Sequence, residues 1–188
     1  MGLWIFLLII LVIIIFGIFI RNKIVLHFNA TKRAWADVAT YERQKLKVLD
    51  ELAPMVEQYA GFEKDTLEKV TELRQSILNL NVDHTDIAQL QRIENLNKEL
   101  MRSLNVVVEN YPELKANEIY LRMMNEIDEQ NDNVSAAITI FNRNVELFNN
   151  HIEVFPNNMI NTLTLGKKSI RPFRDHAAAQ SFDYRPNF

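Results

Sequence analysis

The chain has 188 residues, a formal net charge of -3, four glycines and no cysteine. The absence of cysteine excludes disulfides, thiolate metal sites and cysteine nucleophiles, and the small negative charge disfavours a nucleic-acid partner. So few glycines disfavour glycine-rich phosphate loops and β-sandwiches, and they favour long helices.

The first stretch of the chain is an apolar run from Leu3 to Ile20 that contains no charged residue and no proline. A helix of this length is about 27 Å long, close to the roughly 30 Å hydrocarbon core of a bilayer. The alternative is a cleaved signal peptide, which needs a basic segment before a shorter apolar core and small residues at the cleavage site. Neither feature is present, so we predict an uncleaved transmembrane anchor over residues 1–23.

Basic residues flank the apolar run on its C-terminal side only. Arg21, Lys23, Lys32 and Arg33 follow the run, and no lysine or arginine precedes it. Short loops rich in lysine and arginine stay in the cytoplasm. This pattern predicts a single-pass protein with its short N-terminus outside and the remaining chain in the cytoplasm.

Apolar residues recur in steps of three, four and seven over residues 24–59, which predicts a long helix. Glu42 and Lys45 interrupt the apolar stripe midway. Pro54 predicts a kink or short break just before it, because proline cannot donate a backbone hydrogen bond. Gly61 is expected to end the helix, since glycine is the usual left-handed residue after a helix C-terminus.

The same spacing predicts a second helix over residues 63–80 and a third over residues 87–110. A polar turn is expected between them at residues 79–85. Asp83 or Thr85 can cap the third helix there, because their side-chain oxygens accept hydrogen bonds from free backbone N–H groups.

A heptad seam between Asn117 and Phe155 gives the strongest periodic signal outside the apolar run. Its one polar member, Asn131, either fixes the register through a partner across the interface or tolerates partial exposure, and exposure is the simpler expectation. The seam is longer than one globular helix needs, so part of it is expected to lie uncovered and to drive self-association. The seam comprises Tyr120, Met124, Ile127, Asn131, Val134, Ile138, Phe141, Val145, Phe148, Ile152 and Phe155.

Several amphipathic helices joined by short turns predict an all-α fold. We expect the N-terminal transmembrane helix to be followed, over residues 24–156, by an antiparallel, up-and-down four-helix bundle of long helices. The tail, residues 157–188, contains Gly166, Pro172 and Pro186 and has no sustained apolar stripe. We predict that it is irregular, with a helical turn near residues 158–163.

Three segments carry distinctive motifs: residues 34–61 (AWADV at the start, VLDELAPMVEQYAG at the end), 111–117 (YPELKAN) and 141–156 (FNRNVELFNNHIEVFP). Together with the apolar run they resemble the LemA family, with YPELKAN and the spaced aromatic–asparagine pairs as the most specific part. The resemblance implies a bacterial membrane-anchored helical bundle and no agreed molecular function. One departure is Met55, where family members often carry an asparagine after the proline.

Two polar features are candidate partner or inter-helix contacts. In the YPELKAN segment, Tyr111 is expected to pack, Pro112 to stop one helix and Asn117 to cap the next; a direct partner site is the alternative. Asn142 and Asn149 lie one heptad apart beside the phenylalanine seam. Hydrogen bonding between helices is their simplest role, and a ligand site is the alternative.

The tail also carries a basic cluster of Lys167, Lys168, Arg171 and Arg174. Anionic lipid attracts such residues by about 1 kcal/mol each near a membrane surface, and a solvated tail is the alternative. We predict no catalytic, cofactor-binding or metal site. The four histidines are far apart in the sequence, and none lies three or four positions from a second ligand on one helix face.

These features predict a non-enzymatic, membrane-anchored scaffold or adaptor of the bacterial inner (cytoplasmic) membrane. The alternatives are a membrane-organising homo-oligomer and, less favoured, an enzyme with a site in the bundle. The expected partners are the membrane, further copies of the chain and an unidentified membrane or envelope protein. No cofactor and no nucleic acid are expected.

Overall fold

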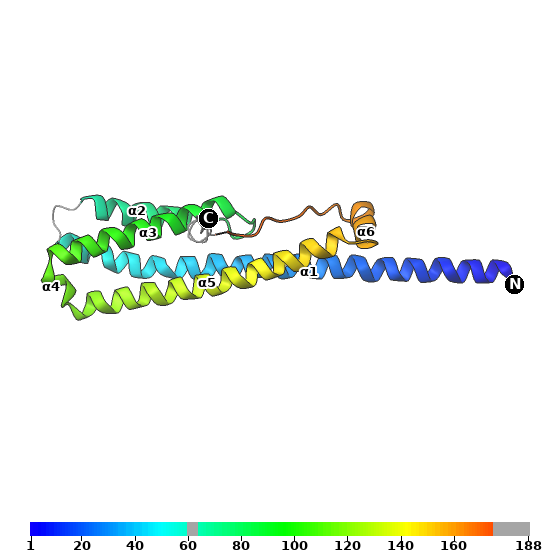
Figure 1. The fold of residues 1–188 in the computed structure, drawn as a ribbon, viewed down its shortest axis with the longest axis horizontal. Helices are drawn as coiled ribbons and strands as arrows, with labels where there is room; N and C mark the ends of the chain where they lie inside the picture. Colours follow the sequence, from blue (N-terminus) through cyan, green and yellow to red (C-terminus); the bar gives the residue numbers. More distant parts are fainter. Residues whose placement is uncertain (60–63, 175–188) are drawn as a thin grey trace, which may run out of the picture. The chain divides into compact units, whose positions relative to one another are not determined.

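The fold was derived from a computed structural model, which describes residues 1–59 and 64–174. Over these residues the chain is helical without strands, so the predicted all-α class is confirmed (Figure 1). The up-and-down four-helix arrangement stays a prediction. The helices are α1 (Gly2–Tyr59), α2 (Lys64–Leu78), α3 (Ile87–Asn110), α4 (Pro112–Lys115), α5 (Glu118–Glu153) and α6 (Asn157–Thr164).

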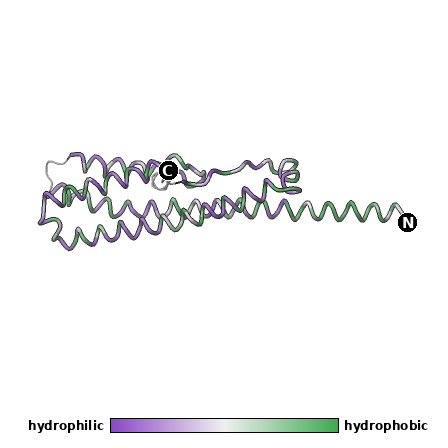
Figure 2. Tube along the Cα trace, viewed as in Figure 1, coloured by the Kyte–Doolittle hydropathy of each residue, from purple (hydrophilic) through white to green (hydrophobic). Residues whose placement is uncertain are grey.

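Helix α1 contains both the apolar run and the first predicted bundle helix without interruption. Hydrophobic residues dominate its N-terminal part (Figure 2), and their side chains are exposed from Leu3 to Phe16. Of the kink or short break expected before Pro54, the break is absent, since this proline lies inside the helix. Leu52 and Val56 on either side are fully buried, so packing offsets the lost backbone hydrogen bond. Gly61, the expected helix stop, lies outside the described residues.

The described residues form two compact units. The first, which we call the anchor unit, contains residues 1–34 and 140–172; the second unit contains the described residues of 35–139 together with 173 and 174. Helices α1 and α5 contribute to both. These limits differ from the sequence-based division into residues 1–23, 24–156 and 157–188, which stays a prediction. Within the predicted irregular tail, residues 157–164 form α6, longer than the expected helical turn.

The second unit pairs α2 with α3, which lie side by side (Figure 1). The apolar residues that predict α3 are all buried: Leu90, Ile93, Leu96, Leu100, Leu104 and Val107. Its N-terminus is capped by Asp86, whose carboxylate accepts a hydrogen bond from the Gln89 N–H, and not by Asp83 or Thr85. The chain stays irregular up to Asp86, so the first free N–H groups lie beyond the reach of the two earlier side chains.

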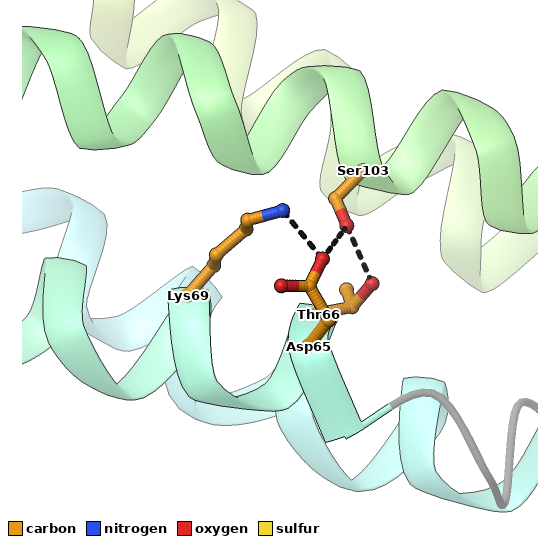
Figure 3. A network of polar contacts seen from close by, with 4 residues as sticks. All are labelled: Asp65, Thr66, Lys69 and Ser103. Carbon is orange, nitrogen blue, oxygen red and sulfur yellow. Dashed lines mark hydrogen bonds and ion pairs between the residues drawn. The ribbon is translucent and has the colours of Figure 1, made fainter.

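A polar network also connects α2 to α3 (Figure 3). The hydroxyl oxygens of Thr66 and Ser103 lie 2.7 Å apart, and the Ser103 hydroxyl also donates to Asp65 at 3.4 Å. Asp65 forms an ion pair with Lys69 one turn along the helix. The hydrogen bond from Lys69 lowers the pKa of Asp65. Because both hydroxyls satisfy each other, burying them costs the α2–α3 contact little.

The seam of α5 is buried along most of its length, with two shifts of one position. Met123 and Ala137 are buried where Met124 and Ile138 were expected, as the difference between 3.6 residues per turn and a 3.5-residue repeat allows. The side-chain oxygen of Asn131 accepts a hydrogen bond of 3.1 Å from Asn97 on α3, and Asn131 is also partly exposed, as the simpler expectation held. This bond fits the register role that was the alternative.

The C-terminal part of the seam is covered. Ile152 of α5 is buried and clusters with Phe148 and with Ile20 and Ile24 of α1. Only Phe155, beyond the end of α5, is exposed among the last four seam residues. Up to Ile152 the seam is covered, because α1 continues as a helix and supplies the partner surface. The expected self-association stays a prediction.

Candidate functional site

Polar and aromatic contacts concentrate in the anchor unit, where α1, α5, α6 and the segment after α6 meet. We call this region the junction. It is a candidate site because it joins the apolar helix to parts of the chain far away in sequence. The junction comprises His27, Phe28, Phe148, Asn149, His151, Asn157, Asn161 and Lys167.

Asn149 holds the segment after α6 against α5. Its side-chain amide donates to the Ile170 carbonyl at 2.8 Å and accepts from the Ile170 N–H at 2.9 Å. This paired arrangement replaces the hydrogen bonds that an irregular backbone would otherwise make with water. The sequence singled out Asn149, and the structure shows that its contact is with this segment and not with another helix.

Asn161 makes the corresponding pair of hydrogen bonds to Lys167, at 2.8 Å to the carbonyl and 3.0 Å from the N–H. Gly166 between them has a φ of 59°, a conformation that glycine adopts without steric cost. The Gly166 N–H donates to the Asn161 carbonyl at 2.7 Å. The end of α6 is thus closed by a tight turn that returns the chain toward α5.

Lys167 contributes its ammonium as well as its backbone. The Nζ atom lies 3.8 Å from the centroid of the Phe28 ring, a cation–π distance, and Phe28 in turn packs on Phe148 at 5.5 Å between centroids. The other three basic residues predicted to contact lipid, Lys168, Arg171 and Arg174, are exposed. Arg174 belongs to the second unit.

A histidine pair in the junction was not anticipated from the sequence. The rings of His27 on α1 and His151 on α5 lie 5.1 Å apart between centroids. The Asn157 amide lies 3.3 Å from His151 Nδ1, while His151 Nε2 is buried without a hydrogen-bond partner among the described residues. The pKa of His151 is lowered mainly by burial, and further by the nearby His27 and Lys23. The junction therefore favours a neutral His151.

The YPELKAN residues lie in the second unit. The Tyr111 N–H donates to the Val107 carbonyl at the end of α3, and Pro112 is the first residue of α4. The Asn117 carboxamide oxygen accepts from the N–H groups of Ile119 and Tyr120 at 2.9 and 3.3 Å, so the expected cap of α5 is confirmed. Asn142 is half-buried on α5 in the anchor unit. A partner role for these residues stays a prediction.

A buried charged pair forms a second unusual feature. Glu42 and Lys45 of α1, which interrupt the apolar stripe, are fully buried and form an ion pair of 3.2 Å. Burial raises the pKa of Glu42 to about 7; Lys45 opposes the shift, and Glu94 on α3 adds to it. The sequence marked these positions only as a weak point of the stripe, because no pattern shows that a charged residue is buried.

Within the part of the chain that the structure describes, no group of three histidine, aspartate or glutamate side chains could hold a metal ion.

Comparison with known proteins extends the resemblance seen in the sequence. The model of the LemA family matches residues 34–182. Protein LemA of Metamycoplasma hominis is 30% identical over 123 residues, which cover 65% of this chain and 54% of that protein. The chain thus spans about half the length of this curated relative.

Proposed function

Since the chain belongs to the LemA family, we propose that it is a non-enzymatic, membrane-anchored scaffold or adaptor. The observation that carries this proposal is the continuity of α1. The exposed apolar run and the buried face around Trp35 and Val38 belong to one helix of 58 residues. An uninterrupted helix of this kind connects the apolar run directly to the folded part of the chain and would keep that part beside a bilayer.

The apolar helix is a candidate membrane anchor by length and composition. Its location in a bacterial inner membrane, with the other helices in the cytoplasm, follows from the basic residues after the run and belongs to the proposal. The exposed Lys168 and Arg171 are suited to anionic headgroups at the same surface. The proposed partner is a membrane or envelope protein.

One observation favours the alternative of a membrane-organising homo-oligomer. Ile140 and Leu147 are about half exposed and lie seven residues apart on the outer face of α5, and the half-exposed Val154, just after the end of the helix, continues the spacing. An exposed apolar stripe with heptad spacing is suited to a second copy of the same helix. Anchoring in one membrane would raise the effective concentration of such copies.

Photo-cross-linking in native membranes separates the two functions. A photoreactive residue replaces Leu147 on the stripe or Val106 in the second unit, and both side chains are about half exposed. A scaffold is expected to give one defined heterologous adduct that mass spectrometry identifies. The control is a photoreactive residue at the adjacent exposed Glu146. If Leu147 forms adducts only with other copies of the chain, and Glu146 forms none, the result favours the homo-oligomer and contradicts the scaffold.

A further inference from the structure

The residues between Glu153 and Lys167, which contain α6, include no charged side chain. Thirteen consecutive uncharged residues are unusual at the surface of a chain in which 24% of residues are charged. Four large apolar side chains of this segment are more than half exposed: Val154, Phe155, Met159 and Leu163. Phe155 and Leu163 each reach 77%. Large exposed apolar side chains gathered in one short segment often mark an interaction site.

Helix α6 has the inverse of the usual amphipathic pattern. The amides of Asn157 and Asn161, one turn apart, are buried at 9% and 8% exposure, whereas Met159 and Leu163 point outward. Water would favour the opposite orientation, because an exposed amide and a buried leucine are both more stable there. The helix is therefore oriented for apolar surroundings.

The outward polar groups of α6 also make hydrogen bonds within the helix. The hydroxyls of Thr162 and Thr164 donate to the carbonyls of Asn158 and Ile160, at 2.9 and 2.6 Å. The carboxamide oxygen of Asn158 accepts from the Met159 N–H at 2.8 Å. Satisfying polar groups internally is required wherever water is absent.

The position of α6 along α1 identifies what surrounds it. A Cβ placed on Gly17 would lie 3.6 Å from Ile160, so α6 packs beside the last turn of the apolar run. Gly17 precedes Arg21, the first charged residue after the run, by about 6 Å of helix. Asn157 also borders a largely apolar groove of about 580 Å³. The groove is lined by Phe16, Phe19, Ile20 and Leu26 together with Asn22, Lys23 and His151. Any bilayer that contains the apolar run therefore reaches α6.

We infer that residues 154–166 form a second membrane-contacting element, which inserts its apolar face among the lipids of the leaflet where α1 leaves the bilayer. Phe155, Met159 and Leu163 contact acyl chains, and the junction holds the element in place through Asn149, Asn157 and Asn161. The exposed Lys168 follows at the level of the lipid phosphates, where lysine side chains extend toward the headgroups. The inference rests on the proposed anchoring by α1.

Depth-dependent fluorescence quenching tests this inference. Because the chain has no native cysteine, single-cysteine variants of the full-length protein take one environment-sensitive dye each. Leu163→Cys and Met159→Cys report on α6, Ile13→Cys reports on the apolar run, and Arg143→Cys is an exposed control on α5. The labelled proteins are reconstituted in vesicles of phosphatidylcholine and phosphatidylglycerol. Quenchers are lipids with a nitroxide near the headgroup or deep in the acyl chain, and aqueous iodide.

The dyes at 163 and 159 should be quenched most by the shallow nitroxide and be several-fold less accessible to iodide than the dye at 143. The dye at 13 should respond to the deep nitroxide. Iodide quenching at 163 and 159 equal to that at 143, with 13 still in lipid, would overturn the inference and leave the anchoring intact. Exposure of position 13 to iodide would overturn both.

Discussion

Phe148 is a fully buried side chain of the anchor unit, in contact with Phe28 and in one cluster with Ile24. Truncating it to alanine removes the aromatic contact and leaves a cavity, so Phe148→Ala should lower the free energy of unfolding by about 3–5 kcal/mol. Leu121→Ala, at a half-exposed position of the same helix, should cost about 0.5 kcal/mol and is the matched control. Denaturant unfolding of the full chain in detergent micelles measures both. Equal losses would mean that Phe148 is not packed as described.

The pKa of His151 is lowered chiefly by burial and secondly by His27. Replacing His27 by glutamine removes the second contribution, so His27→Gln should raise the pKa of His151 part of the way toward its ordinary value. Proton NMR titration of the ring signals measures the shift. An unchanged or lower pKa would show that the two rings do not interact.

The lowered pKa also has a consequence for stability. The folded chain binds a proton at His151 less tightly than the unfolded chain does. The folded state is therefore favoured most above a pH of about 6.5, and this part of its stability is lost as the pH falls below that value. Protonating His151 in the folded chain should therefore take more acid than protonating an ordinary histidine, and the added proton would remove the ability of Nδ1 to accept a hydrogen bond from Asn157.

For single residues, the sequence predicts those contacts that a side chain makes with its neighbours along one helix. Asn117 caps α5 as expected, because the cap needs only N–H groups two and three residues ahead. The pairing of His27 with His151 was missed, since it depends on how two helices are rotated and aligned. The Asn161–Lys167 turn was also missed, although an asparagine shortly before a glycine could have indicated it.

At the scale of elements, the buried Glu42–Lys45 pair decides how stable the middle of α1 is. Removing two buried charges from water is costly, and replacing such a pair by apolar residues of similar volume is often neutral or stabilising by about 1–4 kcal/mol. The double variant Glu42→Met/Lys45→Met should therefore be at least as stable as the parent at pH 7.5. Lys45→Met alone should be less stable than the double variant, because Glu42 stays buried without the ammonium group that opposes the rise of its pKa.

The pH dependence gives an independent test of the same pair. The raised pKa of Glu42 means that the folded chain binds this proton more tightly than the unfolded chain. The stability that Glu42 contributes is fully present below about pH 4.5 and is lost as the pH rises through about 7. The free energy of unfolding should therefore fall by about 2 kcal/mol between pH 5.5 and 7.5. Denaturation followed by the fluorescence of the buried Trp35 should show this loss in the parent and not in the double variant. The same slope in both proteins would contradict it.

Helix boundaries follow from the sequence where local chemistry decides them. Helix α3 has the predicted limits, because its apolar stripe is regular and Tyr111 precedes a proline. Pro54 does not end α1, since the buried residues around it outweigh a local preference. The buried positions Met123 and Ala137 show that a heptad describes α5 only approximately, and tertiary packing decides which neighbouring side chain turns inward.

At the scale of the whole molecule, the first prediction concerns orientation. With Arg21, Lys23, Lys32 and Arg33 after the apolar run, the remaining chain should face the cytoplasm. Green fluorescent protein fused after Phe188 should therefore fluoresce, and alkaline phosphatase at the same place should be inactive. An active phosphatase together with a dark fluorescent protein would show the opposite orientation.

The central claim is that the apolar run holds the folded part of the chain at a membrane, and alkaline extraction of membranes tests it most directly. Ile10 and Ile14 lie in the middle of the run, where each lysine would cost about 2.5–3.5 kcal/mol of insertion free energy. The full chain and a control variant, Asn22→Lys, should stay in the membrane pellet at alkaline pH. The double variant Ile10→Lys/Ile14→Lys should move to the supernatant, because an interfacial element such as α6 does not resist this treatment alone. Release of the unaltered chain into the supernatant would contradict the account.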